Sequence, residues 1–446
     1  MRHGQDQKQI PFFVATVGKR RALRGGKVRP EGHITDGGLR GLSFRMRKRS
    51  LKCLAWGCLL CPPVAWADVP GGGDTLTLNV GAGLTRDDNL FRAPEGREVS
   101  DEIRTTTLGL RFNKAYSLQR FYVDAQLIDY RYRDNSYLDF TGKNLNAAWA
   151  WKLTPALYGN LSTSRTESLN SFVDYVAANP ELRRNIRTMK RSRFDVEWEA
   201  LGPLHLLSSV SHYEQDNSQT FFEDSAYNAS SAEVGIKYVT SVDSSLALVT
   251  RKTDGSYSRT ANPATLADSG FEQRENEARF VWNPTVKSSA SGRIAHLERR
   301  HDNFHERDFD GYVGSVDFKW GITDKVDFNI GLRRDLNAYQ QLPSLTESYA
   351  NHYVGKSYSF NPVWRITEKT SLGYRHTRQR RDYEGTVVGA DPLRNDRLRY
   401  DTLSFDWEPR SYLRVGIDYQ KMKRDSNDDN FDFKTDVILL TLRLSF

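Results

Sequence analysis

The chain has 446 residues, with 64 lysines and arginines against 56 aspartates and glutamates, a formal net charge of +8 and a mean hydropathy of −0.64. The positive excess is local, because residues 1–67 hold 14 of the basic and only 3 of the acidic residues, which leaves 50 and 53 in the rest. The overall basic character therefore gives no support to a nucleic-acid-binding function, and no nucleic-acid partner is expected.

The first recognisable element is a secretory leader. A basic segment at residues 46–49 precedes a mostly apolar run, and small residues stand at Ala65 and Ala67. These are the three parts of a signal peptide, so we assign it to residues 46–67 and expect cleavage after Ala67. Residues 1–45 fit no targeting or packing pattern, and we interpret them as an untranslated or disordered extension.

The remaining segment, residues 68–446, is predicted to be a single membrane domain. It contains no cysteine, since Cys53, Cys58 and Cys61 all fall in the leader. A thiol-free chain suits a protein that crosses the oxidising periplasm unfolded. The segment also has no apolar run of helical membrane length, which excludes a helical membrane protein.

The strands of this domain are predicted from residue alternation. A period of two places successive side chains on opposite faces of a strand. Such alternation begins at residue 76, returns between the later turns, and is clearest in the last strand, where apolar residues alternate with Thr441, Arg443 and Ser445. Each strand is therefore expected to have one apolar and one polar face.

Nine aromatic residues close the apolar faces at steps of 38 to 47 residues, and a short polar turn follows each of the first eight. An aromatic ring favours the boundary between hydrocarbon and water, so rings repeated at one place in every hairpin predict a membrane girdle. The predicted girdle comprises Phe112, Trp151, Trp198, Tyr238, Trp282, Trp320, Trp364, Trp407 and Phe446.

The short turns alternate with longer polar connections, as the periplasmic turns and external loops of outer-membrane barrels do. Eight turns, with both termini on the same side, predict an all-β fold: a single antiparallel up-and-down transmembrane β-barrel of about 18 strands in the outer membrane of a Gram-negative bacterium. Sixteen strands would result if a weakly patterned hairpin in 205–240 or 271–301 were irregular. The repeat length also suits a β-propeller, but each period offers two strands and a long loop rather than four strands.

The polar faces are predicted to line the lumen, where water or ion pairing lowers the cost of charge. These side chains could form cross-strand ion pairs that stiffen the barrel, or a hydrated path for a polar solute. Tyr122, Tyr130 and Tyr158 share this face and could stack on sugar rings or simply pack. The candidate lumen-lining residues are Arg111, Asp124, Asp195, Glu197, Glu199, Glu277, Arg279, Asp317, Lys319, Asp327, Arg333, Arg375, Asp406, Arg414, Asp418 and Arg443.

Two basic runs adjoin long connections, one from Arg183 to Arg193 and the other from Arg375 to Arg381. Such clusters can neutralise lipopolysaccharide phosphates or meet an acidic polymer, or they can be solvated loops with local counter-charges. The partners expected in the envelope are the lipid bilayer, lipopolysaccharide and, through the C-terminal strand, the barrel assembly machinery.

The sequence contains no evident catalytic or metal-binding constellation. His296, His301 and His305 are close in sequence, but they lack the spacing of a metal site such as His-Glu-x-x-His. A serine hydrolase assembled at one rim of the barrel would leave no recognisable spacing. We nevertheless expect no metal, no cofactor and no enzymatic activity.

The connection after the first strand reads Asp-Asp-Asn-Leu-Phe-Arg-Ala-Pro at residues 87–94. This segment resembles the Asp-Asp-Asn-hydrophobe-Phe segment of the EpsL family, outer-membrane barrels associated with exosortase B and extracellular polysaccharide biosynthesis. It is also similar to the opening of broader β-barrel porin families. The resemblance implies a conduit for polysaccharide that works with periplasmic and inner-membrane export components, but it supplies no substrate-contact residues. The same residues also suit a strand cap and turn.

The sequence thus leads to two candidate functions, with a structural or enzymatic barrel that has a plugged lumen as a third class. The first is an outer-membrane channel that exports extracellular polysaccharide through a hydrated, charged lumen. The alternative is a general diffusion porin for small polar solutes. Porins usually fold one long loop into the lumen, and the connection 165–190, whose basic character would favour anions, is the strongest candidate for such a loop.

Overall fold

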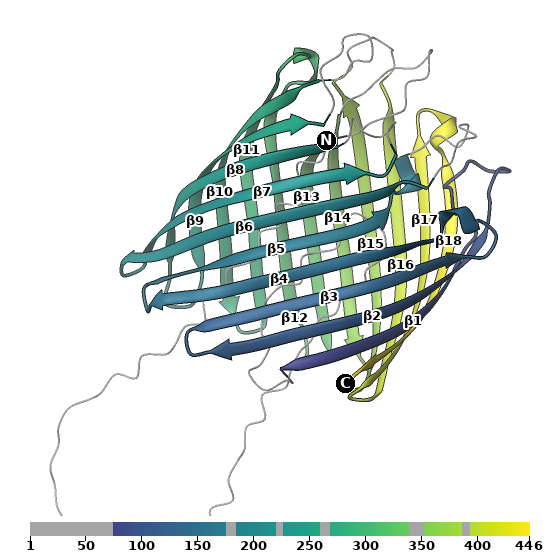
Figure 1. Ribbon diagram of the computed structural model, residues 1–446, viewed down its shortest axis with the longest axis horizontal. Coiled ribbons are helices and arrows are strands. Elements are labelled where there is room, and N and C mark those ends of the chain that lie inside the picture. The colour runs from purple at the N-terminus through teal and green to yellow at the C-terminus, as the bar shows by residue number, and fades with distance from the viewer. Residues whose placement is uncertain (1–74, 175–183, 220–225, 259–267, 339–351, 386–392) are drawn as a thin grey trace, which may run out of the picture. The chain divides into compact units, whose positions relative to one another are not determined.

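The computed structural model describes residues 75–174, 184–219, 226–258, 268–338, 352–385 and 393–446. They form one antiparallel sheet of 18 strands, in which each strand pairs with its neighbours in the chain and β1 (Leu76–Asp87) also pairs with β18 (Phe433–Ser445). The sheet therefore closes into the predicted up-and-down barrel (Figure 1). The predicted extension, residues 1–45, and the predicted leader, residues 46–67, lie outside the described residues.

The strands are 12 to 16 residues long, which is longer than the ten or so that the outer-membrane pattern predicts. The hairpins within 205–240 and 271–301 are regular, so the count is 18 and not 16. In the segments described, no helix combines the length and apolar character needed to cross a membrane. The other strands are β2 (Asp101–Tyr116), β3 (Gln119–Tyr132), β4 (Phe140–Thr154), β5 (Leu157–Leu169), β6 (Ile186–Leu201), β7 (Leu204–Asn217), β8 (Tyr227–Val239), β9 (Ser245–Tyr257), β10 (Gly270–Thr285), β11 (Ser288–His301), β12 (Phe309–Gly321), β13 (Val326–Ala338), β14 (His352–Arg365), β15 (Thr370–Glu384), β16 (Asn395–Arg410) and β17 (Leu413–Ser426).

The outward face of the barrel carries an apolar band. Leu78 and Leu110 face each other across β1 and β2 and are 42% and 47% exposed, and Leu248 of β9 is 53% exposed. A continuous belt of exposed apolar side chains is stable against lipid, and the inter-strand ladder satisfies the backbone polar groups as a bilayer requires. The chain is therefore a β-barrel of the Gram-negative outer membrane.

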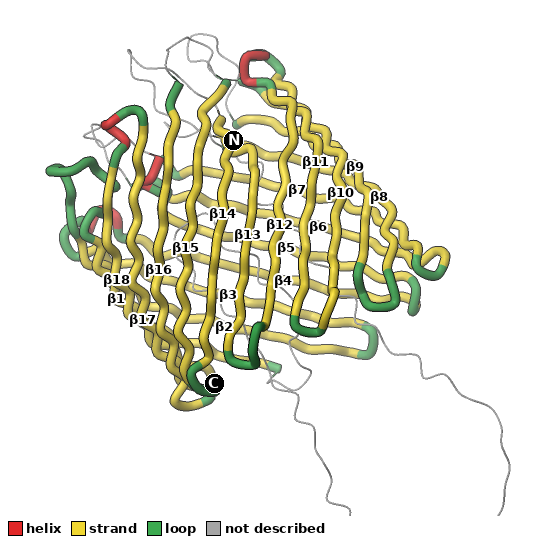
Figure 2. The backbone as a smooth tube through the Cα atoms, turned by 180° about the vertical axis from the view of Figure 1, so that it is seen from behind, coloured by secondary structure: helices red, strands yellow, loops and turns green. Residues whose placement is uncertain are grey.

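Short turns connect the strands at one end of the barrel, and the C-terminus lies at that end as well (Figure 2). The predicted girdle residues lie near these turns on the outward face. Seven of them are between 45% and 60% exposed, and Phe112 is half-buried. The exposed seven are Trp198, Tyr238, Trp282, Trp320, Trp364, Trp407 and Phe446.

Trp151 departs from the prediction of a lipid-facing ring, because it is only 7% exposed. Its partner across β4 and β5 is Gly159, and a Cβ atom at that position would lie 2.6 Å from the indole. The indole occupies the space that this glycine leaves and stacks on Phe194, with ring centroids 5.8 Å apart. Burial of this ring therefore depends on a residue of the next strand.

The segment after β1 folds back on β18 at the far end of the barrel. Asn89 is fully buried, and its Nδ2 donates to the carbonyl oxygens of Ala93 (2.7 Å) and Lys434 (2.9 Å). The hydroxyl of Thr435 on β18 donates to Asp87 at 3.0 Å. The polar residues of the Asp-Asp-Asn segment thus hold β1 against β18, at the point where the barrel closes.

The wall changes character between β12 and β13. Their ladder runs from Gly321 only as far as Gly314, which pairs with Arg334, although both strands continue beyond these residues. Arg334 Nε donates to the carbonyl oxygen of Tyr312 at 2.8 Å, so a side chain takes over where the ladder ends. We call the region beyond this point the seam.

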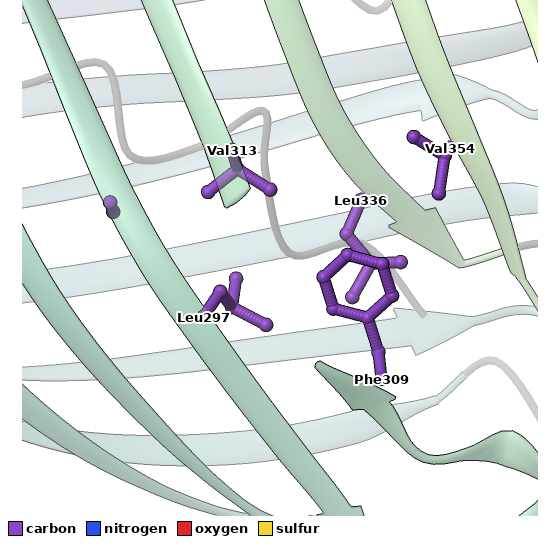
Figure 3. Packing of buried hydrophobic residues seen from close by; sticks show 6 residues of the cluster. Leu297, Phe309, Val313, Leu336 and Val354 are labelled. Atoms are coloured by element: carbon purple, nitrogen blue, oxygen red, sulfur yellow. The ribbon is translucent and has the colours of Figure 1, made fainter. Parts of the chain in front are cut away.

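An apolar cluster closes the seam. Alternation places Leu297, Phe309 and Val313 on the lumen side of β11 and β12, but Leu336 and Val354 on the outward side of β13 and β14. All five are under 10% exposed and pack together (Figure 3). The ends of β13 and β14 away from the short turns therefore lie on the lumen side of β11 and β12. Apolar contact replaces the hydrogen bonds between strands there.

Candidate channel lumen

The strand registers place the predicted lumen residues on the face opposite the apolar band. Arg111 and Asp124, for example, are cross-strand partners on β2 and β3, while the adjacent pair, Leu110 and Ala125, faces outward. The same alternation places on the lumen face Asp195, Glu197, Glu199, Glu277, Arg279, Asp317, Lys319, Asp327, Arg333, Arg375, Asp406, Arg414, Asp418 and Arg443, together with Tyr122, Tyr130 and Tyr158.

The lumen-facing charges of β6 to β11 form a network, which we call the paired wall. Glu233 on β8 is at its centre and is 5% exposed. Its carboxylate accepts hydrogen bonds from Arg251 Nε (3.0 Å), Arg279 Nη2 (2.7 Å) and Arg193 Nη2 (3.2 Å). Three guanidinium groups from three different strands thus converge on one buried carboxylate.

The network continues toward β11. Glu275 accepts from Arg251 Nη1 at 3.1 Å and from Arg293 Nη2 at 2.9 Å. Glu277 lies 3.4 Å from Arg293 Nε and 3.7 Å from Arg251 Nη2. The side chains of both glutamates are only 2% exposed, and each has at least two cationic neighbours. Asp195 of β6, in the same cross-strand row as Glu233, lies 3.5 Å from Arg193.

Register and side-chain size explain the network. Glu233, Arg251 and Glu275 are successive cross-strand partners on β8, β9 and β10, so opposite charges face one another directly. Arg193 on β6 is opposite Ser211 of β7, whose small side chain lets the arginine reach over to Glu233 on β8.

A second buried group lies in the same wall nearer the short turns. Glu197 is fully buried and accepts from Lys237 Nζ at 2.8 Å, while His205 Nδ1 lies 2.5 Å from the same carboxylate oxygen. Burying charges is favourable only when the pairing is complete, and removing one partner is strongly destabilising. The paired wall is therefore best explained as a structural element.

The lumen-facing charges of β12 to β18, together with those of β2 and β3, form a second region, which we call the open wall. Lys319, Arg375 and Arg443 are exposed and lie on its lumen face. Within the described part of the chain, none of the three has an ion-pair partner within 4.0 Å. Asp317, two residues from Lys319, is also exposed. Water in the lumen therefore reaches these three cations and this carboxylate.

Farther from the short turns, Asp396 on the lumen face of β16 is fully buried and pairs with Arg394 at 2.6 Å. Nearer the short turns, the ion pairs of the open wall are single and less buried. Arg111 and Asp124 are 2.8 Å apart, with 40% and 10% of their side chains exposed. Arg365 pairs with Asp327, and the Arg414–Glu408 pair has 19% and 40% of its side chains exposed. These pairs lie on the lumen face near the short turns.

The opposite end of the lumen, which we call the mouth, is narrowed by two connections. Phe91, after β1, packs edge-on against Phe172, after β5, with centroids 5.0 Å apart. Arg424 projects from the lumen face of β17 and hydrogen bonds to the carbonyl oxygen of Val173. The described part of the predicted inward loop therefore reaches the lumen side of β17, while residues 175–183 lie outside the described residues.

The structure divides the two basic runs. In the second run, Arg375 and Arg381 face the lumen whereas Arg378 and Arg380 face outward, because all four belong to β15 and not to a loop. In the first run, residues 186–193 belong to β6 and Arg183 lies outside the described residues. Within the strands, neither run forms one cluster, since alternation sends neighbouring residues to opposite faces.

Several central residues of the paired wall were absent from the sequence-based candidates, notably Glu233, Arg251, Glu275 and Arg293. Alternation could have found them, because Glu233 has the same parity as Gly235 and Lys237, opposite to the outward Val234 and Ile236. Their partners could not have been found in this way, because pairing depends on the register between strands.

The histidines near the end of β11 do not converge on a common centre. His296 Nε2 lies 2.8 Å from Asp310 on the outward face, whereas His301 and His305 are both near Asp308. Among the residues with described positions, no cluster of three or more potential metal ligands was found.

Neither a protein-family model nor a curated protein matches the sequence. Among solved structures, the fold is similar to OpdK of Pseudomonas aeruginosa with vanillate (11% identity, TM-score 0.47, 83% of this chain and 99% of that chain). It is also similar to OccK2 (OpdF) of the same species with glucuronate (10%, 0.47, 83% and 98%) and to a BenF-like porin from Pseudomonas fluorescens Pf-5 (12%, 0.46, 83% and 98%). These identities show a likeness of fold alone.

Proposed function

We propose that the protein is a diffusion channel for small polar solutes with a moderate preference for anions. The observation that carries this proposal is the exposure of Lys319, Arg375 and Arg443 on the lumen face of the open wall without ion-pair partners among the described residues. Cations that keep their charge free in a hydrated passage attract anions and raise their local concentration.

The three cations belong to three well-separated strands, β12, β15 and β18, and lie in the half of the barrel nearer the short turns. A solute crossing this half would meet them from one side, while the paired wall presents charges that are already compensated. Asp317 next to Lys319 reduces the positive potential, so the expected selectivity is moderate.

The mouth supports passage of small solutes over passage of a wide polymer. The packing of Phe91 on Phe172 and the bond from Arg424 to Val173 place two connections on the lumen side of the barrel. Segments fixed inside the mouth reduce the free cross-section, as an inward loop does in a diffusion channel.

The test is a measurement of ion selectivity in planar bilayers under a potassium chloride gradient. We expect the wild-type channel to conduct and to prefer chloride, and the triple variant Lys319→Gln, Arg375→Gln, Arg443→Gln to lose that preference. A matched control neutralises three exposed cations on the outward face, Lys252, Arg274 and Arg300. Absence of conductance, or equal reversal potentials for the triple variant and wild type, would contradict the proposal.

Export of extracellular polysaccharide is the second candidate, and it rests on the resemblance of residues 87–94. In the structure, Asp87 and Asn89 of this segment bind Thr435 and Lys434 and so hold β1 to β18. These two polar side chains are therefore engaged in closing the barrel. A deletion strain assayed for surface polysaccharide separates the two functions, because loss of polymer restored by the wild-type gene would favour export.

A further inference from the structure

We propose that the outward face of β14 to β17 binds the phosphate groups of a phosphorylated glycolipid in the outer leaflet of the membrane. The site is formed by Arg378 and Arg380 on β15 and by Arg397 and Arg399 on β16, which we call the arginine patch. It lies on the outside of the barrel and is independent of the solute that passes through the lumen.

The height of the arginine patch matches that of lipid headgroups. Its four side chains are exposed and alternate with lumen-facing residues of β15 and β16. Below them on β16, the outward positions are occupied first by Asp401 and then by Leu403, Phe405 and the girdle residue Trp407, of which Leu403 is 47% exposed. The patch therefore begins beyond the apolar band, on the side away from the short turns.

Like charges oppose one another directly in the patch. Arg378 is the cross-strand partner of Arg399, and Arg380 is the partner of Arg397. The adjacent strands add cations, since Lys356 of β14 is opposite Arg380 and Lys423 of β17 is opposite Arg399. Directly opposed like charges destabilise a sheet unless anions compensate them. Six cations from four strands thus share one surface.

The nearby carboxylates compensate only part of this charge. Asp382 accepts from Arg380 Nε at 2.9 Å and lies 3.3 Å from Lys356 Nζ. Asp401 accepts from Arg399 Nε at 2.6 Å, from the hydroxyl of Tyr374 at 2.6 Å and is bonded to His376 Nδ1 at 2.7 Å.

The third carboxylate is Asp425, which is opposite Arg397 but lies 2.6 Å from Lys423 Nζ. Arg378 and Arg397 therefore have neither a hydrogen bond nor an ion pair to any residue with a described position. The guanidinium groups of Arg378 and Arg397 are thus exposed and available. Their cross-strand partners, Arg399 and Arg380, already bind carboxylates.

The outward face of β9 to β11 provides a contrast at a similar height. Arg274 stands eight residues before Trp282, as Arg399 stands eight residues before Trp407. Arg274 is opposite Lys252, but Glu272 contacts both, at 2.9 and 3.2 Å, and Glu298 is opposite Arg274 on the other side. Charge is balanced locally there, so the excess in the arginine patch is not a general property of the outer rim.

Phosphate monoesters fit this excess better than single carboxylates do. Each phosphate carries more than one negative charge and presents oxygens that guanidinium groups bind in a bidentate manner. The acyl chains of a glycolipid held there would lie along the apolar band beneath, against Leu403 and Phe405. This combination favours a phosphorylated lipid of the outer leaflet over free phosphate.

The experiment measures binding of diphosphorylated lipid A to the purified full-length protein in detergent by native mass spectrometry. We expect the double variant Arg378→Gln, Arg397→Gln to bind on the order of tenfold more weakly, because it loses the two available guanidinium groups. The control Arg274→Gln, Arg300→Gln is expected to bind like the wild type. Monophosphorylated lipid A is expected to bind more weakly to the wild type than the diphosphorylated form.

A second variant, Arg378→Lys, Arg397→Lys, keeps the charge but removes the bidentate geometry, and we expect intermediate affinity. Heat-dependent electrophoretic mobility and ion conductance check that each barrel is folded. Wild-type affinity in the Arg378→Gln, Arg397→Gln variant, or an equal loss in the control, would overturn the proposal. Displacement of the lipid from the wild type by millimolar inorganic phosphate would also overturn it. The same holds if the Arg378→Gln, Arg397→Gln variant loses binding of dextran sulfate but keeps its binding of lipid A.

Discussion

The two walls of the lumen use the same residue types in different ways. In the paired wall, Glu233 and Arg251 are about 5% exposed and each touches several opposite charges. In the open wall, Lys319, Arg375 and Arg443 are exposed to the lumen. The alternation of apolar and polar residues is the same in both regions, so polar character alone does not tell a structural charge from one available to a solute.

Cross-strand neighbours account for the difference. Glu233 has Arg251 as its direct partner. Arg375 is opposite Thr402, whereas Lys319 is opposite Ser289 on one side and Asn329 on the other. Arg443 is opposite Gly81 on one side and Arg414 on the other. A charged side chain without an oppositely charged cross-strand partner is left to water, whereas one with opposite charges beside it is drawn into a buried network.

The largest expected effect comes from breaking the paired wall. Glu233→Gln removes the charge that three arginines share, so we expect the free energy of unfolding to fall by about 3–5 kcal/mol. Urea unfolding in lipid vesicles, followed by tryptophan fluorescence, measures this change. The matched control in the open wall is Asp317→Asn, for which we expect a change within about 0.5 kcal/mol. Similar losses in both variants would remove the distinction between the walls.

A smaller effect is expected at the seam, whose apolar cluster joins β11 of the paired wall to β12, β13 and β14 of the open wall. Leu336→Ala removes an apolar side chain from the cluster that replaces the ladder, and the expected loss is about 2–4 kcal/mol. Leu332→Ala is the control, because Leu332 lies on the same strand and the same parity but is 55% exposed to lipid. The same unfolding assay applies, and an equal or larger loss in the control would mean that the seam cluster does not stabilise the wall.

The smallest effect on stability, but a clear one on accessibility, is expected from single cysteines in each wall. The mature chain is predicted to contain no cysteine, so each introduced thiol is the only one. We expect a charged methanethiosulfonate reagent to modify Arg375→Cys on the order of tenfold faster than Ser209→Cys, since access controls the reaction of a thiol. Ser209 lies in the paired wall and is 5% exposed. Equal modification rates would show that both walls are open to water.

The sequence alone determined the barrel, a count of about 18 strands, the side with the short turns and the alternation of apolar and polar faces along each strand. These properties depend on relations within one strand or one hairpin, where a period of two and a girdle residue are visible in the order of residues. The alternation that assigns Arg111 and Arg443 to the lumen, for example, requires no knowledge of which strand lies beside them.

Only the tertiary structure decided which side chains meet. Trp151 is buried because Gly159 of the next strand leaves space for its ring, and Leu336 is buried although its parity points outward, because β13 passes inside β12. The partners of Glu233 and the opposed arginines of the arginine patch likewise depend on register between strands. Register is a relation between distant segments, so the same alternating pattern is compatible with paired, open and apolar walls until neighbouring strands are aligned.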